Sequence, residues 1–211
     1  MRYFLILLGV FGLVASASPQ PAGRTEALAK LDSPVAQERA QAVAVLAKTG
    51  RMADVPALVA RLRDSEPAVR GLAEQAVWEV WSRSGDPEVD RLFARGVAEM
   101  ESRDFASAIT TFTRIIELKP DFAEGWNKRA TVYFLTGDYE RSLADCDEVI
   151  RRNPYHFGAL AGYGQIYLHL RQYDKALEYF RKALAVNPNL EGVRRLVEAL
   201  EARRRGQRQT I

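Results

Sequence analysis

The sequence is poor in the residues that form covalent or metal cross-links. It contains 1 cysteine and 2 histidines among 211 residues, so an internal disulfide is excluded and a four-ligand zinc site is not expected. An excess of one charge sign is also missing, because 30 Lys and Arg stand against 27 Asp and Glu, a formal net charge of +3. This balance provides no overall basic field for nucleic acid. We therefore expect no metal, no cofactor and no nucleic-acid partner.

Signatures of catalysis are missing as well. The sequence has no G-x-S-x-G, H-E-x-x-H or C-x-x-C motif, and the segment 162–164 (GYG) lacks the preceding strand of a nucleotide-binding loop. His156 and His169 are too far apart to form a ligand pair on one helix face. The acidic residues at 145–148 are expected to form a solvated helix face. No catalytic residue is predicted, and the protein is not expected to be an enzyme.

One long apolar run stands at positions 4–14, and it is shorter than the roughly 20 residues of a membrane-spanning helix. Arg2 precedes the run and the small residues Ala15-Ser16-Ala17 follow it, a pattern typical of a signal peptide that is cleaved after Ala17. An uncleaved membrane anchor is the alternative. Residues 1–17 are thus predicted to direct export to the periplasm or the cell exterior. Residues 18–23 would form a short leader, and the mature chain would have no spanning segment.

A repeat of 34 residues runs through the C-terminal half. Pro120, Pro154 and Pro188 keep this interval. Five further columns also keep it: Phe105, Tyr139 and Tyr173; Ala108, Ser142 and Ala176; Phe112, Cys146 and Phe180; Leu92, Trp126 and Leu160; Gly96, Ala130 and Gly164. Six columns with one period indicate that the same structural unit occurs three times.

Each unit is predicted to be a pair of helices. Apolar residues recur with helical spacing over 123–136 and 140–152, and Gly137-Asp138 between them marks a turn. The small residues of the Gly96 column would let the paired helices approach closely, and the proline would end the second helix. Cys146 takes the place of an aromatic residue in its column, so we expect it to be buried and unreactive.

These columns resemble the tetratricopeptide repeat, whose signature places Trp/Leu, Gly/Ala, Tyr, Ala, Phe and Pro at fixed offsets. Three units span residues 89–190. The resemblance implies an all-α, right-handed superhelix of stacked helical hairpins, a solenoid. An amphipathic run over 189–205 is predicted to cap the last unit, and a basic tail follows at 206–211. Arg95, Glu99 and Arg129 depart from the family pattern.

Residues 24–84 carry a second helical pattern. The stretch 64–70 (DSEPAVR) opens a helix, and three pairs of residues lie 31 positions apart: Leu31 and Leu62, Arg39 and Arg70, Ala42 and Ala73. This segment resembles short HEAT-like repeats, a resemblance which implies that an Asp and an Arg of the stretch support neighbouring turns.

Trp78 and Trp81 stand three positions apart at the end of this segment, on one helix face. We predict that they pack at the junction between the two arrays; stacking on a sugar or peptide is the alternative. Because only the turn at 84–87 separates the arrays, we expect them to stack as one continuous solenoid.

The tetratricopeptide resemblance also implies where a partner binds. Stacked hairpins leave a concave groove, which is lined by the first helix of each unit. The predicted peptide-binding groove contains Phe93, Val97, Met100, Glu101, Glu124, Asn127, Thr131, Phe134, Gln165, Leu168 and His169. Some tetratricopeptide domains clamp a chain-terminal carboxylate, but that clamp is absent here because its columns hold Phe93, Val97, Lys128, Gly158 and Gly162.

The predicted function is that of a non-enzymatic protein–protein interaction module of the cell envelope. It would capture an apolar peptide segment of a partner protein, with Asn127 and Gln165 forming hydrogen bonds to the peptide backbone. The alternative is a structural scaffold or accessory subunit of an envelope complex that uses its convex face and basic C-terminal tail. Arg203–Arg205 and Arg208 either complement a helix dipole or contact anionic lipid or an acidic partner.

Overall fold

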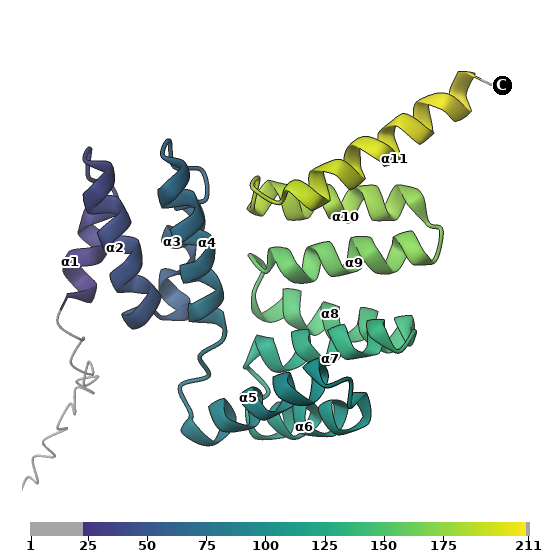
Figure 1. The fold of residues 1–211 in the computed structure, drawn as a ribbon, viewed down its shortest axis with the longest axis horizontal. Helices are drawn as coiled ribbons and strands as arrows, with labels where there is room; N and C mark the ends of the chain where they lie inside the picture. The colour runs from purple at the N-terminus through teal and green to yellow at the C-terminus, as the bar shows by residue number, and fades with distance from the viewer. Residues whose placement is uncertain (1–22, 210–211) are drawn as a thin grey trace, which may run out of the picture.

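The computed structural model describes residues 23–209, with side chains up to residue 205. Within this range the chain is helical throughout and contains no strand, so the predicted all-α solenoid fold is confirmed (Figure 1). The elements are α1 (Arg24–Lys30), α2 (Ala36–Thr49), the 3-10 helix η1 (Met52–Asp54), α3 (Val55–Arg61), α4 (Pro67–Trp81), α5 (Pro87–Glu101), α6 (Phe105–Leu118), α7 (Ala123–Leu135), α8 (Tyr139–Arg152), α9 (Phe157–His169), α10 (Tyr173–Val186) and α11 (Glu191–Gln209). The predicted signal peptide at 1–17 lies outside the described residues.

The helices form two bodies, which we call the N-terminal module (α1–α4) and the repeat array (α5–α11). In the array, the predicted hairpin over 123–136 and 140–152 is observed as α7 and α8, and the neighbouring helices pair in the same way. The last helix, α11, continues to Gln209, four residues beyond the predicted cap. No helix in the described part of the chain is both long and apolar enough to cross a bilayer.

The turns inside the three hairpins share one geometry. Arg103, Gly137 and Arg171, again 34 residues apart, have positive φ angles of 64°, 81° and 59°. Glycine adopts this conformation freely, whereas a side chain there costs about 1–2 kcal/mol. Asp104 and Asp138 then cap α6 and α8 through their carboxylates. The repeated turn is therefore imposed by the hairpin even where the residue does not favour it.

Each hairpin is held together by a small residue that faces a larger one. A Cβ atom on Gly164 would lie 2.3 Å from the ring of Phe180, and one on Gly96 would lie 2.8 Å from the ring of Phe112. In the middle hairpin the glycine is replaced by the larger Ala130 and the phenylalanine by the smaller Cys146, and the two residues pack in one cluster. The predicted close approach at this column is confirmed, and it explains why cysteine replaces the aromatic residue there.

We expect Gly164→Ala to destabilise the protein by about 2 kcal/mol, because the added methyl group overpacks a buried ring that has no room to move. The matched control is Gly162→Ala on the same helix, where the nearest atom to the new Cβ is the Sγ of Cys146 at 3.9 Å. That variant should gain up to about 1 kcal/mol from helix propensity. Urea unfolding measures both changes, and equal stability of the two variants would contradict the packing.

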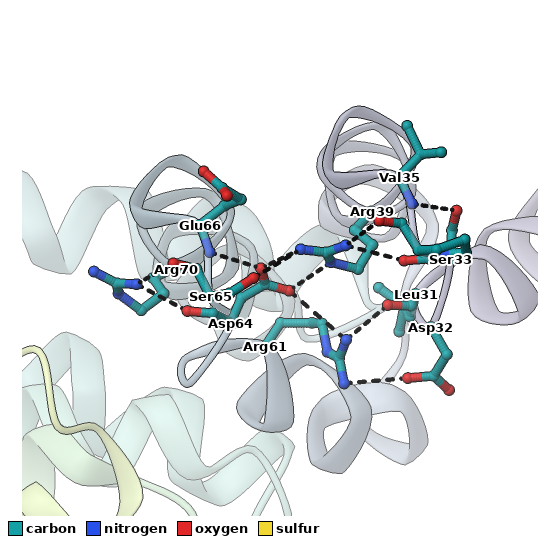
Figure 2. A network of polar contacts seen from close by, with 11 residues as sticks. Leu31, Asp32, Ser33, Val35, Arg39, Arg61, Asp64, Ser65, Glu66 and Arg70 are labelled. Atoms are coloured by element: carbon teal, nitrogen blue, oxygen red, sulfur yellow. Dashed lines mark hydrogen bonds and ion pairs between the residues drawn. The ribbon is translucent and has the colours of Figure 1, made fainter.

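In the N-terminal module, a buried ion pair joins Arg39 of α2 to Asp64 in the turn that precedes α4 (Figure 2). The carboxylate of Asp64 accepts hydrogen bonds from Nε and Nη2 of Arg39 at 2.8 and 2.6 Å. Arg39 also donates to the Ser33 carbonyl, and Arg70 donates to the Asp64 carbonyl. The supporting role expected for an Asp and an Arg of this stretch is therefore observed. Asp64 is 8% exposed, so water competes little for these bonds.

This ion pair makes stability depend on pH. The Arg39 guanidinium lowers the pKa of Asp64 from 3.8 to about 2, although burial acts in the opposite direction. Because the folded-state pKa is the lower one, the stabilisation of about 2 kcal/mol is complete at neutral pH and is lost as the pH falls through about 4 toward 2. We expect Asp64→Asn to remove most of it at pH 7.

Unfolding free energies at pH 7 and pH 3 test this prediction. The matched control is Asp32→Asn, since the Asp32 side chain is 84% exposed in its ion pair with Arg61 and should contribute less than about 1 kcal/mol. An Asp64→Asn variant that is as stable as the Asp32→Asn variant at pH 7 would overturn this account.

The two bodies do not stack end to end, and the expected continuous solenoid is corrected. Helix α4 instead lies beside the ends of the array helices, against the turns that precede α9 and α11 (Figure 1). Trp78 and Trp81 pack on Phe157 at ring distances of 5.3 and 5.0 Å, which confirms their predicted junction role. Asn189 donates to the Leu62 carbonyl at 2.7 Å. The broad aromatic face of α4 is buried by these turns rather than by α5.

Candidate functional site

A cavity of about 130 Å³ opens between α7 and α9 in the repeat array. Its lining contains four of the predicted groove residues, Asn127, Thr131, Phe134 and Gln165, and is completed by Ala130, Ser142, Cys146, Gly158, Ala159, Gly162 and Ile166. Most of these residues are apolar. The two first helices of successive repeats therefore present one shared, mainly apolar hollow.

The hollow exists because the residues around it are small. Gly158 and Gly162 occupy consecutive turns of α9, and neither places a side chain into the space. Cys146 fills less volume than the phenylalanines of its column. At one end the N-terminal module closes in, because a Cβ on Gly158 would lie 2.6 Å from the ring of Trp78. Helix α4 thus packs against Gly158, one of the lining residues, a contact that the repeat pattern could not predict.

Two side-chain amides stand at this hollow. Gln165 forms no side-chain hydrogen bond with any described residue, so both its oxygen and its nitrogen are available to a partner. Asn127 uses its Nδ2 to donate to Glu124 at 3.0 Å, which leaves its Oδ1 as an acceptor. Amide groups beside an apolar cavity can bind a peptide backbone while a side chain enters the cavity.

The cysteine in the wall is not reactive. Cys146 is 3% exposed, and burial, with the nearby Asp145 and Asp147, raises the pKa of its thiol to about 12. A neutral, inaccessible thiol is neither a nucleophile nor a metal ligand. The prediction that it is a packing residue is confirmed.

Behind the hollow lies a buried chain of polar contacts. His156 and Glu124 are 0% and 1% exposed, and their Nε2 and Oε1 atoms are 2.6 Å apart. His156 Nδ1 accepts the Ala159 N–H at 3.0 Å, so the ring proton is on Nε2 and is donated to Glu124. Burial raises the pKa of Glu124, but His156 and Asn127 outweigh it and the pKa is lowered. Glu124 is therefore ionised.

The structure does not place Glu124, a predicted groove residue, in the lining of the hollow. Its side chain is buried and accepts a hydrogen bond from the amide of Asn127. His156 stacks on Trp81 of the N-terminal module, with ring centres 4.3 Å apart. The docking of the module is thus connected to a groove residue through three successive contacts. The sequence offered one signal for this role of His156. The residue occupies a column of the repeat that otherwise holds the apolar residues Phe122 and Leu190.

The other predicted groove residues lie along the same array at different depths. Phe93, Val97 and Met100 are half-buried and pack in the cluster of α5 and α6. Leu168 packs toward Phe180 and α11. Glu101 and His169 are exposed, and His169 contacts Phe134 edge-on at 5.1 Å. The structure therefore brings Asn127, Thr131, Phe134, Gln165 and His169 together, and it uses the remaining apolar residues largely for packing.

The acidic cluster of α8 is only in part the solvated face that we expected, because Asp147 is exposed whereas Asp145 is buried. Asp145 is 4% exposed and accepts two hydrogen bonds from Arg129, each 2.8 Å long. This pair explains why arginine replaces an apolar residue of the repeat pattern at position 129. In the described part of the chain, no group of three or more His, Cys, Asp or Glu residues is arranged to hold a metal ion.

Two family profiles described as tetratricopeptide repeat match the chain, over residues 93–157 and 160–190. Residues 93–190 are therefore an array of tetratricopeptide repeats. The matches cover most of α5 and α9 and all of α6, α7, α8 and α10, the region of the 34-residue columns and of the hollow. The predicted repeats are confirmed there, whereas the profiles do not extend to the N-terminal module.

The chain is similar to known proteins over part of its length. A TPR repeat-containing protein of Rhizobium etli is 32% identical over 108 residues, which cover 51% of this chain and 53% of that protein. The Hsp70-Hsp90 organizing protein 1 of Glycine max is 27% identical over 156 residues, or 72% of this chain and 26% of that protein. This chain thus spans about half of the first relative and about a quarter of the second.

Solved structures resemble the fold. The Sgt2 TPR domain of Aspergillus fumigatus aligns with a TM-score of 0.55 and 21% identity, over 59% of this chain and 83% of that one. The TPR2B domain of yeast Sti1, in a complex with pHsp70, aligns with a TM-score of 0.52 and 19% identity, over 56% of this chain and 99% of that one. MamA of Desulfovibrio magneticus aligns with a TM-score of 0.52 and 19% identity, over 75% of this chain and 88% of that one. At these identities the likeness establishes the fold alone.

We expect Glu124→Ala to destabilise the protein by about 3 kcal/mol, because it leaves a buried histidine and a buried amide without their shared partner. The matched control is Glu178→Ala, whose exposed pair with Lys182 should contribute less than about 1 kcal/mol. Thermal or urea unfolding measures the difference. A loss no larger than that of Glu178→Ala would show that the buried pair does not hold this region.

Proposed function

We propose that this protein is a non-enzymatic interaction module whose α7–α9 hollow accepts one apolar side chain of a partner peptide. The observation that carries the proposal is the small apolar cavity with the amides of Asn127 and Gln165 at its lining. Its volume of about 130 Å³ is below the roughly 300–1,000 Å³ of small-molecule sites. One aliphatic or small aromatic side chain fits this volume, and the amides bind the backbone beside it.

The proposed ligand is an internal peptide segment rather than a chain terminus. The Sti1 domain named above was solved with pHsp70, and some tetratricopeptide domains clamp a terminal carboxylate. In this chain four of the five corresponding columns hold residues without a charge, namely Phe93, Val97, Gly158 and Gly162. Lys128, the cation among them, is half-buried beside Glu124. A terminal carboxylate would therefore meet mainly uncharged side chains instead of the cations of the clamp.

We also propose that the N-terminal module is a HEAT-like pair of hairpins. The Arg39–Asp64 pair and the Arg70 contact support this interpretation, because they join successive turns. Export to the cell envelope is likewise proposed, from the pattern at 1–17. Determination of the mature N-terminus tests it: an N-terminus at Ser18 is expected, and an intact Met1 on a protein that fractionates with the cytoplasm would contradict it.

Peptide selection against the purified chain tests the binding proposal. We expect selected peptides to share an internal apolar residue and to bind equally well with a free or an amidated C-terminus. Gly162→Leu, which fills the hollow, and Phe134→Ser, which removes its apolar wall, should each weaken binding about tenfold or more. Fluorescence anisotropy with a labelled peptide measures the affinities.

The matched control is Leu118→Ser, which removes an exposed apolar residue (38% exposed) outside the hollow and should leave affinity unchanged. Binding that survives both Gly162→Leu and Phe134→Ser, or that is lost when the peptide is amidated, would exclude the proposed hollow. The first of these results would favour a scaffold that contacts partners through its convex face.

A further inference from the structure

A second cavity lies where the N-terminal module meets the repeat array. Its volume is about 330 Å³, and its walls come from the end of α4, from the turn after it, and from the turns that precede α7 and α9. This volume falls in the range of small-molecule sites, about 300–1,000 Å³. None of the predicted groove residues is in its lining, so it is distinct from the hollow between α7 and α9.

Two buried hydrogen-bond donors in this lining have no acceptor among the described residues. The indole Nε1 of Trp81 and the amide Nδ2 of Asn153 are both inaccessible and unpartnered, and the two residues are 3% and 2% exposed. Buried donors are nearly always paired in folded proteins, because an unpaired one loses its bond to water without replacement. Both residues line the same cavity, so one acceptor-bearing ligand there can satisfy both once the two N–H groups turn toward it.

Positive charge gathers around these donors. Lys119, Arg83 and Arg152 line the cavity, against one carboxylate, the exposed Asp121. Arg83 is held by backbone carbonyls, and the charge of Arg152 is compensated by its ion pair with Glu148. The Lys119 ammonium has no hydrogen bond or ion pair with any described residue, so it supplies the uncompensated charge. Helix α7 also begins at this cavity without a side-chain cap, so its first N–H groups add to the positive end.

We propose that this cavity is a binding site for a small oxyanion, of the phosphate or carboxylate class. The two unpartnered groups are N–H donors, and the free charge, that of Lys119, is positive. A ligand that is rich in hydrogen-bond acceptors and negatively charged therefore fits both the donors and the charge. Lys119 supplies the free charge, while Trp81 and Asn153 supply neutral hydrogen bonds. Because Trp81 and Arg83 come from one body and Lys119 and Asn153 from the other, the bound anion stabilises the docking of the two.

Titration with inorganic phosphate and, separately, with acetate tests the site, at constant ionic strength set by chloride. The readout is the ¹H–¹⁵N spectrum of the full chain, in which the Trp81 indole signal is assigned by its loss in Trp81→Phe. We expect saturable shifts of the Trp81 indole and Asn153 amide signals with at least one of the two anions. The Trp78 and Trp126 indole signals report that each variant is folded.

Lys119→Gln should weaken the anion about tenfold, the effect of removing one charge-assisted hydrogen bond. Lys175→Gln, an exposed lysine on α10 that contacts Tyr167, is the charge-matched control and should bind as the original chain does. Asn153→Asp keeps the acceptor used by the Tyr155 N–H, removes the donor and adds a negative charge, so it should abolish binding.

Three results would overturn the proposal. The first is the absence of a saturable shift with both anions, which means that water alone occupies the cavity. The second is equal affinity of Lys119→Gln and Lys175→Gln, which means that binding is a general effect of charge. The third is a saturable shift elsewhere in the spectrum without one at Trp81 or Asn153, which places the anion at another site. A response to one anion and not the other identifies which class the site takes.

Discussion

The contact of α4 with the start of α9 is the interaction on which most of this architecture depends. Trp78 and Trp81 require a large apolar cover, and Phe157, which is 1% exposed, supplies it. Gly158 permits the approach because it has no Cβ to meet the Trp78 ring. The junction therefore rests on close packing of aromatic rings, in which even one added methyl group is felt.

Three features follow from this contact. Gly158 in the groove wall is backed by Trp78 of α4, the buried His156 is stacked on Trp81, and the cavity that contains Lys119 is enclosed between the two bodies. His156 connects them, because its ring touches the N-terminal module and its proton is held by Glu124. A residue that caps one helix thus also supports a groove amide and a module interface.

Within the array, the repeat pattern tolerates substitutions that occur in matched pairs. Cysteine at position 146 accompanies Ala130, where the outer hairpins pair phenylalanine with glycine. Arginine at position 129 accompanies the buried Asp145. These two departures from the consensus are thus each compensated by a direct partner on the facing helix, so hairpin geometry is kept while the chemistry of the wall changes.

The sequence by itself determined the hairpins, because helical periodicity, the Gly137-Asp138 turn and the proline columns are local signals that each act within a few residues. It also indicated four of the residues that line the hollow, since they recur in fixed columns of one helix face. The tertiary structure alone decided how α4 docks, which placed Trp81 against His156 some 75 positions away. It also decided that Glu124 lies behind the groove and that Lys119 and Asn153 share a cavity. Such pairings depend on which apolar surfaces fit closely in three dimensions, and no local pattern of residues encodes that fit.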